Sequence, residues 1–113
     1  MRIIRNNFIP FTGFAAINLF GLLFVRKDVV MTDRMLNHEK IHTAQMKEML
    51  YIFFYLWYII EWLIRLFMKG NAYKNISFER EAYTKENNPN YLLERKSYDW
   101  IKYIRSINLK TEL

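Results

Sequence analysis

The chain has 113 residues, no cysteine and a formal net charge of +6. This length provides one modest core, which predicts a single domain over residues 1–113. The absence of cysteine excludes a disulfide framework and a thiolate metal site. The sequence has no dense basic run and no nucleic-acid-binding motif, so we expect no specific nucleic-acid partner.

The first predicted elements lie in an uncharged stretch, residues 6–25. Its hydropathy resembles that of a signal peptide or a membrane span. Its asparagines, its turn residues and the lack of a clear cleavage site favour a loop at Pro10–Gly13. Short strands are expected near residues 14–19 and 22–27, and the second ends in charged residues, as an edge strand does. Contact of this stretch with a membrane stays open.

A helix is predicted to start after Thr32, a good N-cap, with Asp33 in its first turn. Residues 49–60 then form an uncharged run, and Glu61 and Arg65 follow at a spacing that allows them to pair. A helix that is apolar all round is either buried or in lipid. Because the run is shorter than the roughly 18 residues of a clear span, we expect a buried or interface-lying helix.

The remainder reads as a loop at residues 69–75 and two further helices. Ser77 is predicted to cap the first of these helices, which begins SFEREAYTKE. An amphipathic helix is expected over residues 91–104, and its predicted core contacts are Tyr91, Leu92, Trp100, Tyr103 and Ile104.

The motif HEKIH, residues 38–42, contains both histidines of the chain. Residues four apart lie on one face of a helix, so His38 and His42 can direct ring nitrogens at one metal ion. Glu39 is placed where it can take a proton from a water molecule on that ion and pass it to a leaving amine. Chance alone also produces such motifs, but the predicted helix is the context that metal binding requires.

A catalytic zinc site usually has three protein ligands, and no third histidine exists. The metzincin extension is absent, because Gln45 and Glu48 occupy its key positions. A downstream carboxylate must serve, and Glu79 and Glu81 are the candidates. Their side chains point to nearly opposite sides of a helix. Ala82 lies on the Glu79 side and would allow close packing, which favours Glu79 over Glu81.

HEKIH followed about forty residues later by EREA, residues 79–82, resembles the gluzincins, zinc metallopeptidases with a glutamate third ligand. It is also similar to the catalytic core of CAAX-type membrane zinc proteases. The resemblance implies metal ligands His38, His42 and Glu79, with Glu39 as general base. It departs at Tyr83, where such families often carry an aspartate that supports the histidine helix.

The resemblance implies a zincin-like α+β domain, mostly helical, with a short hairpin or edge strand near the N-terminus. The strand near residues 22–27 would then either bind an extended peptide substrate or only close the core. Oxyanion stabilisation would come from Tyr83, Tyr91 or the zinc ion itself.

Chain geometry adds one expectation. A straight helix over residues 33–68 would carry the chain about 39 Å beyond His42. The following loop spans only about 30–32 Å when fully extended. Glu79 can therefore return to the histidines only if the helix breaks, and we predict that break near residues 45–50.

The sequence thus predicts a zinc-dependent metallopeptidase that hydrolyses a peptide or protein substrate. The alternative is an inactive protein that associates with a membrane surface or a partner and keeps a vestigial or structural metal site. Salt-sensitive nonspecific nucleic-acid binding is a weaker third possibility. The location, cytoplasmic or membrane-associated, the oligomeric state and the membrane contact of residues 49–68 stay open.

Overall fold

The computed structural model of the chain describes residues 2–9 and 15–104. It is an α+β fold in which helices predominate. In chain order the elements are β1 (Arg2–Asn6), β2 (Ala16–Leu19), β3 (Leu22–Arg26), α1 (Asp33–Glu48), α2 (Ile52–Leu66), α3 (Ser77–Lys85), α4 (Tyr91–Glu94) and the short 3-10 helix η1 (Asp99–Tyr103).

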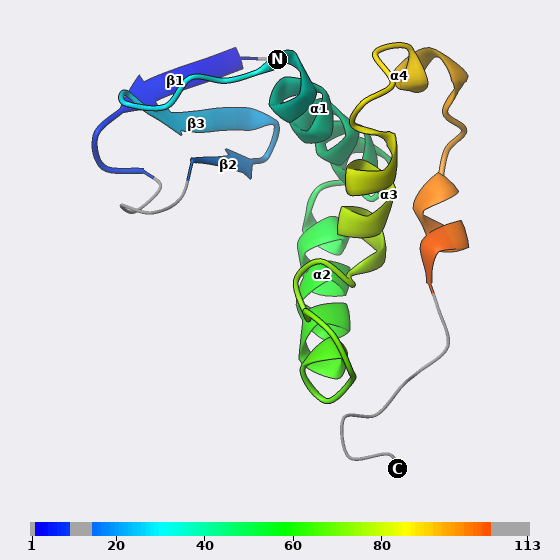
Figure 1. Ribbon diagram of the computed structural model, residues 1–113. Coiled ribbons are helices and arrows are strands. Elements are labelled where there is room, and N and C mark those ends of the chain that lie inside the picture. The colour runs from blue at the N-terminus through cyan, green and yellow to red at the C-terminus, as the bar shows by residue number, and fades with distance from the viewer. Residues whose placement is uncertain (1, 10–14, 105–113) are drawn as a thin grey trace.

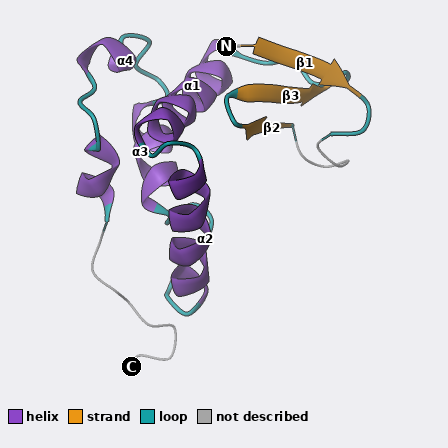
Figure 2. Ribbon diagram, turned by 180° about the vertical axis from the view of Figure 1, so that it is seen from behind, coloured by secondary structure: helices purple, strands orange, loops and turns teal. Residues whose placement is uncertain are grey.

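The three strands form one small sheet on one side of α1, and α4 and η1 lie on the other side (Figures 1 and 2). The predicted strand pair near the N-terminus is confirmed as the β2–β3 hairpin, whose turn at Phe20 and Gly21 has φ of 54° and 88°. Two such left-handed residues match the twist of a tight hairpin. The predicted loop at Pro10–Gly13 lies outside the described residues.

The expectation that the strand near residues 22–27 forms an edge is wrong. The sheet order is β1-β3-β2, so β3 is the central strand, parallel to β1 and antiparallel to β2. Residues Arg2–Asn6, for which the sequence predicts no strand, form β1. This strand pairs with β3 and covers the edge that β3 would otherwise expose. The edge strand beside α1 is β2, where the Asn18 side chain donates to Glu39 O and Thr43 Oγ1 at 3.1 and 2.9 Å.

Helix α1 begins as predicted, because the Thr32 hydroxyl accepts a hydrogen bond from Met35 N at 3.1 Å. The predicted break is also present. Leu50 and Tyr51 have φ of 54° and 60°, and α2 leaves α1 at an angle of 111°. No single described helix is long and apolar enough to cross a membrane, although α1 and α2 together meet that criterion of length and composition across their bend.

The start of α3 depends on α2. Ser77 is the first residue of α3 and not its N-cap, which is Ile76. Instead, the Glu61 carboxylate on α2 accepts hydrogen bonds from the Ser77 amide at 3.0 Å and from its hydroxyl at 2.7 Å. A carboxylate at a helix N-terminus is favourable because free amide groups and the helix dipole meet it there. The predicted Glu61–Arg65 pair is present at 3.7 Å and is buried.

The continuous helix predicted over residues 91–104 is wrong. Helix α4 ends at Glu94, Arg95 is extended with ψ of 136°, and η1 begins only at Asp99. The chain turns because the Arg95 guanidinium forms buried ion pairs with Glu48 on α1 and Glu81 on α3. A helix that continued regularly through Arg95 would not hold its guanidinium against Glu48 and Glu81.

The core lies between α1, α2, α3 and η1. One cluster consists of Met46, Phe54, Ile76, Phe78 and Trp100, and a second consists of Ile41, Ala82 and Tyr91. Ala82 is fully buried, in agreement with its predicted role in close helix packing. The predicted core contacts Tyr91 and Trp100 are confirmed, and Leu92 packs at the margin. Tyr103 is only half-buried, and Ile104 is exposed, because η1 does not continue the expected helix face.

Candidate metal centre

The structure brings His38 and His42 of α1 together with Glu79 from the first turn of α3. All three side chains are buried. The two Nε2 atoms lie 3.1 Å apart, and Glu79 Oε1 lies 3.2 Å from His38 Nε2 and 3.0 Å from His42 Nε2. These three atoms could hold one metal ion.

Glu81, the other candidate ligand, points away from the histidines. Its carboxylate accepts hydrogen bonds from Gln45, Tyr91 and Arg95 on the opposite side of α3. The choice of Glu79 from helix geometry therefore agrees with the arrangement of the side chains. Tyr91 belongs to this second network, and its hydroxyl donates to Glu81 Oε2 at 2.6 Å. It is thus not positioned to stabilise an oxyanion at the histidine cluster.

Gln45 determines the tautomer of His42. Its Nε2 donates to Phe78 O at 3.0 Å and to Glu81 Oε1 at 2.9 Å, and both partners are acceptors. The other end of the amide is therefore the oxygen, which lies 2.8 Å from His42 Nδ1. Nδ1 must then carry a proton and donate it. In neutral His42 this leaves the Nε2 lone pair free to face Glu79 and the second histidine.

Glu86 plays the same role for His38. Its Oε1 lies 3.0 Å from His38 Nδ1, and its Oε2 accepts from Arg34 at 2.8 Å. Metal-ligating histidines commonly donate their second nitrogen to a carboxylate in this way. Tyr83, at the position where the resembling families often carry aspartate, instead packs its ring 4.6 Å from the His38 ring. The carboxylate that contacts His38 in this chain is therefore that of Glu86.

Replacing Glu86 by glutamine is expected to weaken zinc affinity by about 10- to 100-fold, the usual effect of losing such a partner. The amide keeps the size of the side chain, but it loses the negative charge that makes His38 a stronger ligand. A competition titration against a chelator of known affinity measures the change. An affinity equal to that of wild type would contradict this role for Glu86.

The spacing of the three atoms can be compared with a zinc site. Ligands about 2.0–2.1 Å from a tetrahedral zinc ion are about 3.3–3.4 Å from one another. The observed separations of 3.0–3.2 Å are close to that value. The two inward Nε2 atoms and one carboxylate oxygen also match the nitrogen and oxygen ligands that zinc accepts. The residues present therefore fit zinc.

Charge is coupled across the cluster. Burial disfavours a charged His42, but Glu79, with smaller contributions from Glu39 and Gln45, outweighs it and raises the pKa of His42 to about 9. Burial also disfavours a charged Glu79, yet the two histidines hold the pKa of that carboxyl well below its usual range. At neutral pH the His42 ring is therefore protonated, and its positive charge lies beside the Glu79 carboxylate.

Zinc binding at pH 7 is therefore expected to release about one proton, because the ligand must be the neutral imidazole. The affinity for zinc should rise with pH up to about 9, because His42 of the metal-free protein has a pKa of about 9. Above that pH the ring is already neutral, and no proton competes with the metal. Calorimetric titration in buffers of different ionisation enthalpy counts the released protons. Zinc uptake without proton release at pH 7 would contradict the expectation.

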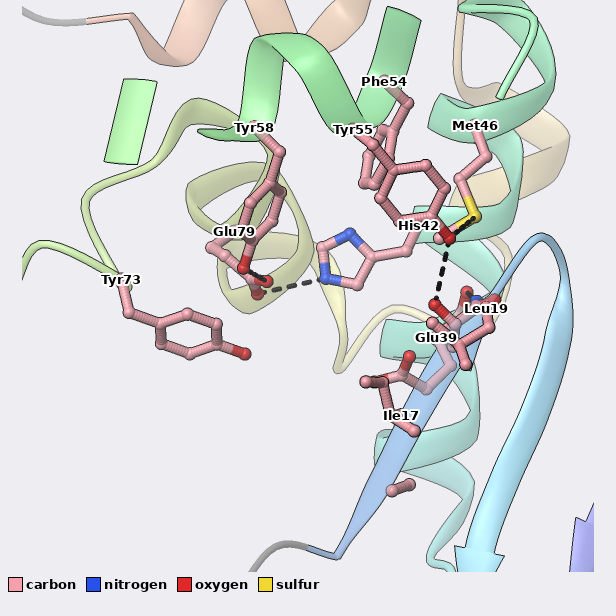
Figure 3. Close-up of a pocket in the computed structure, with 12 residues that line it drawn as sticks. Ile17, Leu19, Glu39, His42, Met46, Phe54, Tyr55, Tyr58, Tyr73 and Glu79 are labelled. Atoms are coloured by element: carbon pink, nitrogen blue, oxygen red, sulfur yellow. Dashed lines mark hydrogen bonds and ion pairs between the residues drawn. The ribbon is translucent and has the colours of Figure 1, made fainter. Parts of the chain in front are cut away.

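A cavity of about 570 Å³ lies beside the cluster, between β2, α1, α2 and Tyr73 (Figure 3). Glu39, His42 and Glu79 all line it. Burial raises the pKa of Glu39 above its ordinary value, and the two histidines oppose the shift. The predicted general base is therefore in the same cavity as two of the predicted metal ligands.

Two tyrosines complete the site. The Tyr58 hydroxyl donates to Glu79 Oε2 at 2.8 Å, which leaves Oε1 facing the histidines. The Tyr73 hydroxyl points into the cavity (Figure 3). Burial, the Glu79 charge and a hydrogen bond with Tyr83 raise the pKa of Tyr73 above its usual range, so its hydroxyl stays protonated.

Sequence reasoning missed four residues of this site: Gln45, Tyr58, Tyr73 and Glu86. Gln45 had a usable signal, because it follows His42 by three positions and shares its helix face. Tyr58 lay hidden in an uncharged aromatic run. Tyr73 is in a loop and Glu86 is just beyond α3, so their positions depend on tertiary structure.

The chain matches no known family, no curated protein and no solved structure.

Proposed function

We propose that the chain is a zinc-dependent peptidase. The observation that carries the proposal is the convergence of three ligand atoms, His38 Nε2, His42 Nε2 and Glu79 Oε1, beside a cavity that also contains Glu39. A zinc ion held there would polarise a substrate carbonyl and lower the pKa of a water molecule. A structural zinc site normally has four protein ligands, so three ligands beside a cavity favour catalysis.

In this proposal Glu39 moves the proton. Its carboxylate takes a proton from the attacking water and returns it to the leaving amine nitrogen as the peptide bond breaks. The raised pKa that burial gives Glu39 suits both steps, because the group must gain and then lose a proton near neutral pH. Tyr73, across the cavity, is the proposed donor to the oxyanion, and its hydroxyl would turn to the substrate from its hydrogen bond with Tyr83. Tyr73 replaces the earlier candidates, because Tyr83 does not line the cavity and Tyr91 is bonded to Glu81.

The proposed substrate is an extended peptide that pairs with β2. This strand is the edge of the sheet beside α1, and its residues Ala16–Leu19 line the cavity. An extended peptide can add to such an edge through main-chain hydrogen bonds. The cavity wall also includes Met46 and Phe54, which favours an apolar substrate side chain next to the cleaved bond.

A library of synthetic peptides, analysed by mass spectrometry, tests this proposal. The zinc-loaded protein should cleave a subset of peptides, preferentially beside apolar residues. Cleavage should stop when a strong chelator removes the metal and return when zinc is added back. Cleavage that persists without metal, or no cleavage of any peptide by fully zinc-loaded protein, would contradict the proposal.

A second candidate function is a membrane-associated protein whose metal site is structural. The observation that favours it is the exposed apolar surface of α2, which contains Phe53, Leu56 and Ile60. The candidate predicts that zinc stabilises the fold while Glu39 has no effect on any activity. That surface is also compatible with an enzyme.

A further inference from the structure

Helix α2 has its polar groups on the inside. The side chains that face the protein are Phe54, Tyr55, Tyr58, Glu61 and Arg65, which include both charged residues of the helix. Every other residue of α2 is exposed and apolar. A surface helix in water normally shows the opposite arrangement, with its charges outward and its apolar stripe inward.

The buried charges are satisfied within the protein. Glu61 receives two hydrogen bonds from Ser77 and pairs with Arg65, whose guanidinium also donates to Met68 Sδ at 3.6 Å. Charged residues of lipid-exposed helices are likewise turned inward and paired. The inward position of Glu61 and Arg65 is therefore part of the fold, and it leaves the outer surface of α2 without charge.

The uncharged surface covers most of the helix. Phe54, Tyr58, Glu61 and Arg65 follow one another by three or four positions, which confines them to one narrow stripe at about 100° per residue. Even with Tyr55 included, about two-thirds of the circumference is apolar. The exposed side chains include Ile52 and Phe53 of α2 and Phe67 at its C-cap, which are 65, 56 and 72% exposed. Figure 1 shows α2 extending from α1 away from the sheet.

We propose that α2 inserts this surface into one leaflet of a lipid bilayer that contains anionic headgroups. A second protein chain covers one side of a helix, whereas lipid can cover an apolar arc of this width. The helix is about 22 Å long at 1.5 Å per residue, shorter than the roughly 30 Å of a hydrocarbon core. It therefore lies in the interface with its apolar arc in the acyl region and its inward stripe toward α3.

The charges near α2 favour anionic lipid. Between residues 49 and 78 the only acidic residue is Glu61, which is buried. The exposed charges of this segment are Lys69 and Lys74, both positive, just beyond the end of α2. Their long side chains can reach headgroups while the helix lies deeper. The formal net charge of +6 adds a general attraction to an anionic surface.

Vesicle binding by the full-length chain tests the proposal. The chain should sediment with vesicles of phosphatidylcholine and phosphatidylglycerol, and less with vesicles of phosphatidylcholine alone. Trp57 and Trp62 are 37 and 40% exposed on α2, whereas Trp100 is buried, so lipids brominated in the acyl chain should quench a large part of the tryptophan emission. This readout needs no variant. A chain that stays in the supernatant with both vesicle types, or bound chain without quenching, would overturn the proposal.

Variants locate the contact. Ile60→Glu and Leu63→Glu are each expected to weaken vesicle binding by at least about tenfold, because each places a charge where an apolar side chain was buried in lipid. Leu93→Glu on α4 is the matched control, since Leu93 is 87% exposed and lies away from α2. It should bind as wild type does. Unchanged zinc content and circular dichroism confirm that each variant is folded.

Sedimentation velocity without vesicles tests the alternative that a second copy of the chain covers the apolar surface of α2. The proposal expects either a monomer that binds lipid or self-associated protein that dissociates when vesicles are added. A defined dimer that Ile60→Glu converts to monomer, and that does not bind vesicles, would overturn the proposal and assign the surface to a second copy of the chain. The lipid test does not depend on peptidase activity, so failure of one proposal leaves the other to be judged separately.

Discussion

Replacement of Glu39 by glutamine is expected to lower peptide turnover by about 10²- to 10⁴-fold, the usual contribution of a general base. Zinc content should not change, because Glu39 is not among the three atoms that converge on the site. Glutamine keeps the size of the side chain and cannot accept the proton from water. The measurement pairs kcat/KM with zinc per chain.

Glu94→Gln provides the control for that experiment. Glu94 is an exposed glutamate on α4, outside the residues that line the cavity, and its replacement should leave both quantities unchanged. If Glu39→Gln keeps full activity, Glu39 is not the base. If it loses zinc together with activity, its role is in metal binding, which would also contradict the proposed mechanism.

Replacement of Arg95 by alanine is expected to lower the free energy of unfolding by about 3–5 kcal/mol, because the carboxylates of Glu48 and Glu81 would lose their buried partner. The Arg95 side chain is only 5% exposed, and it lies 2.7 Å from Glu48 and is also bonded to Glu81. Since Glu81 also holds Gln45, this loss should loosen His42 and weaken zinc binding as well. Urea denaturation of the metal-free protein measures the change in the free energy of unfolding separately from the change in zinc affinity.

Lys96→Ala is the matched control for Arg95→Ala. Lys96 is the next residue, carries the same charge and is exposed. Its replacement should change stability by no more than about 0.5 kcal/mol, as is usual for a surface site. Equal effects of the two substitutions would mean that the buried ion pairs of Arg95 do not hold α4 against α1 and α3.

The sequence contained enough information to place the three potential ligands. Helical periodicity puts His38 and His42 on one face, and it separates Glu79 from Glu81. The length of the chain then requires a break before α2, and the structure has it at Leu50 and Tyr51. Local periodicity and chain length are constraints that a sequence expresses directly, so these features could be predicted.

Other features depend on contacts between distant segments. Strand β1 exists because β3 pairs with it, and its short sequence has no strong strand signal of its own. The helix predicted over residues 91–104 is interrupted because Arg95 has partners on α1 and α3. The support of His38 by Glu86 likewise joins residues 48 positions apart. In each case the tertiary partner overrides a local pattern.

The same limit explains α2. Its sequence predicted a helix apolar on all sides, and its length favoured a buried or interface-lying helix over a membrane span without separating those two. The structure shows a third arrangement, in which the two charges are buried and the apolar residues are exposed. Only the position of Ser77 reveals why Glu61 faces inward. The sequence pattern of α2 alone could not show which of its faces is turned toward the protein and which toward the outside.

The most direct test of the account is the zinc content of protein purified without affinity-tag metals, compared between wild type and Glu79→Gln. Glutamine preserves size and can still accept the Tyr58 hydrogen bond, but it removes the ligand charge. The account predicts about one zinc ion per wild-type chain and its loss through gel filtration in the variant. Wild-type protein that holds no metal even after zinc is added, or a variant that retains zinc as well as wild type, would contradict it.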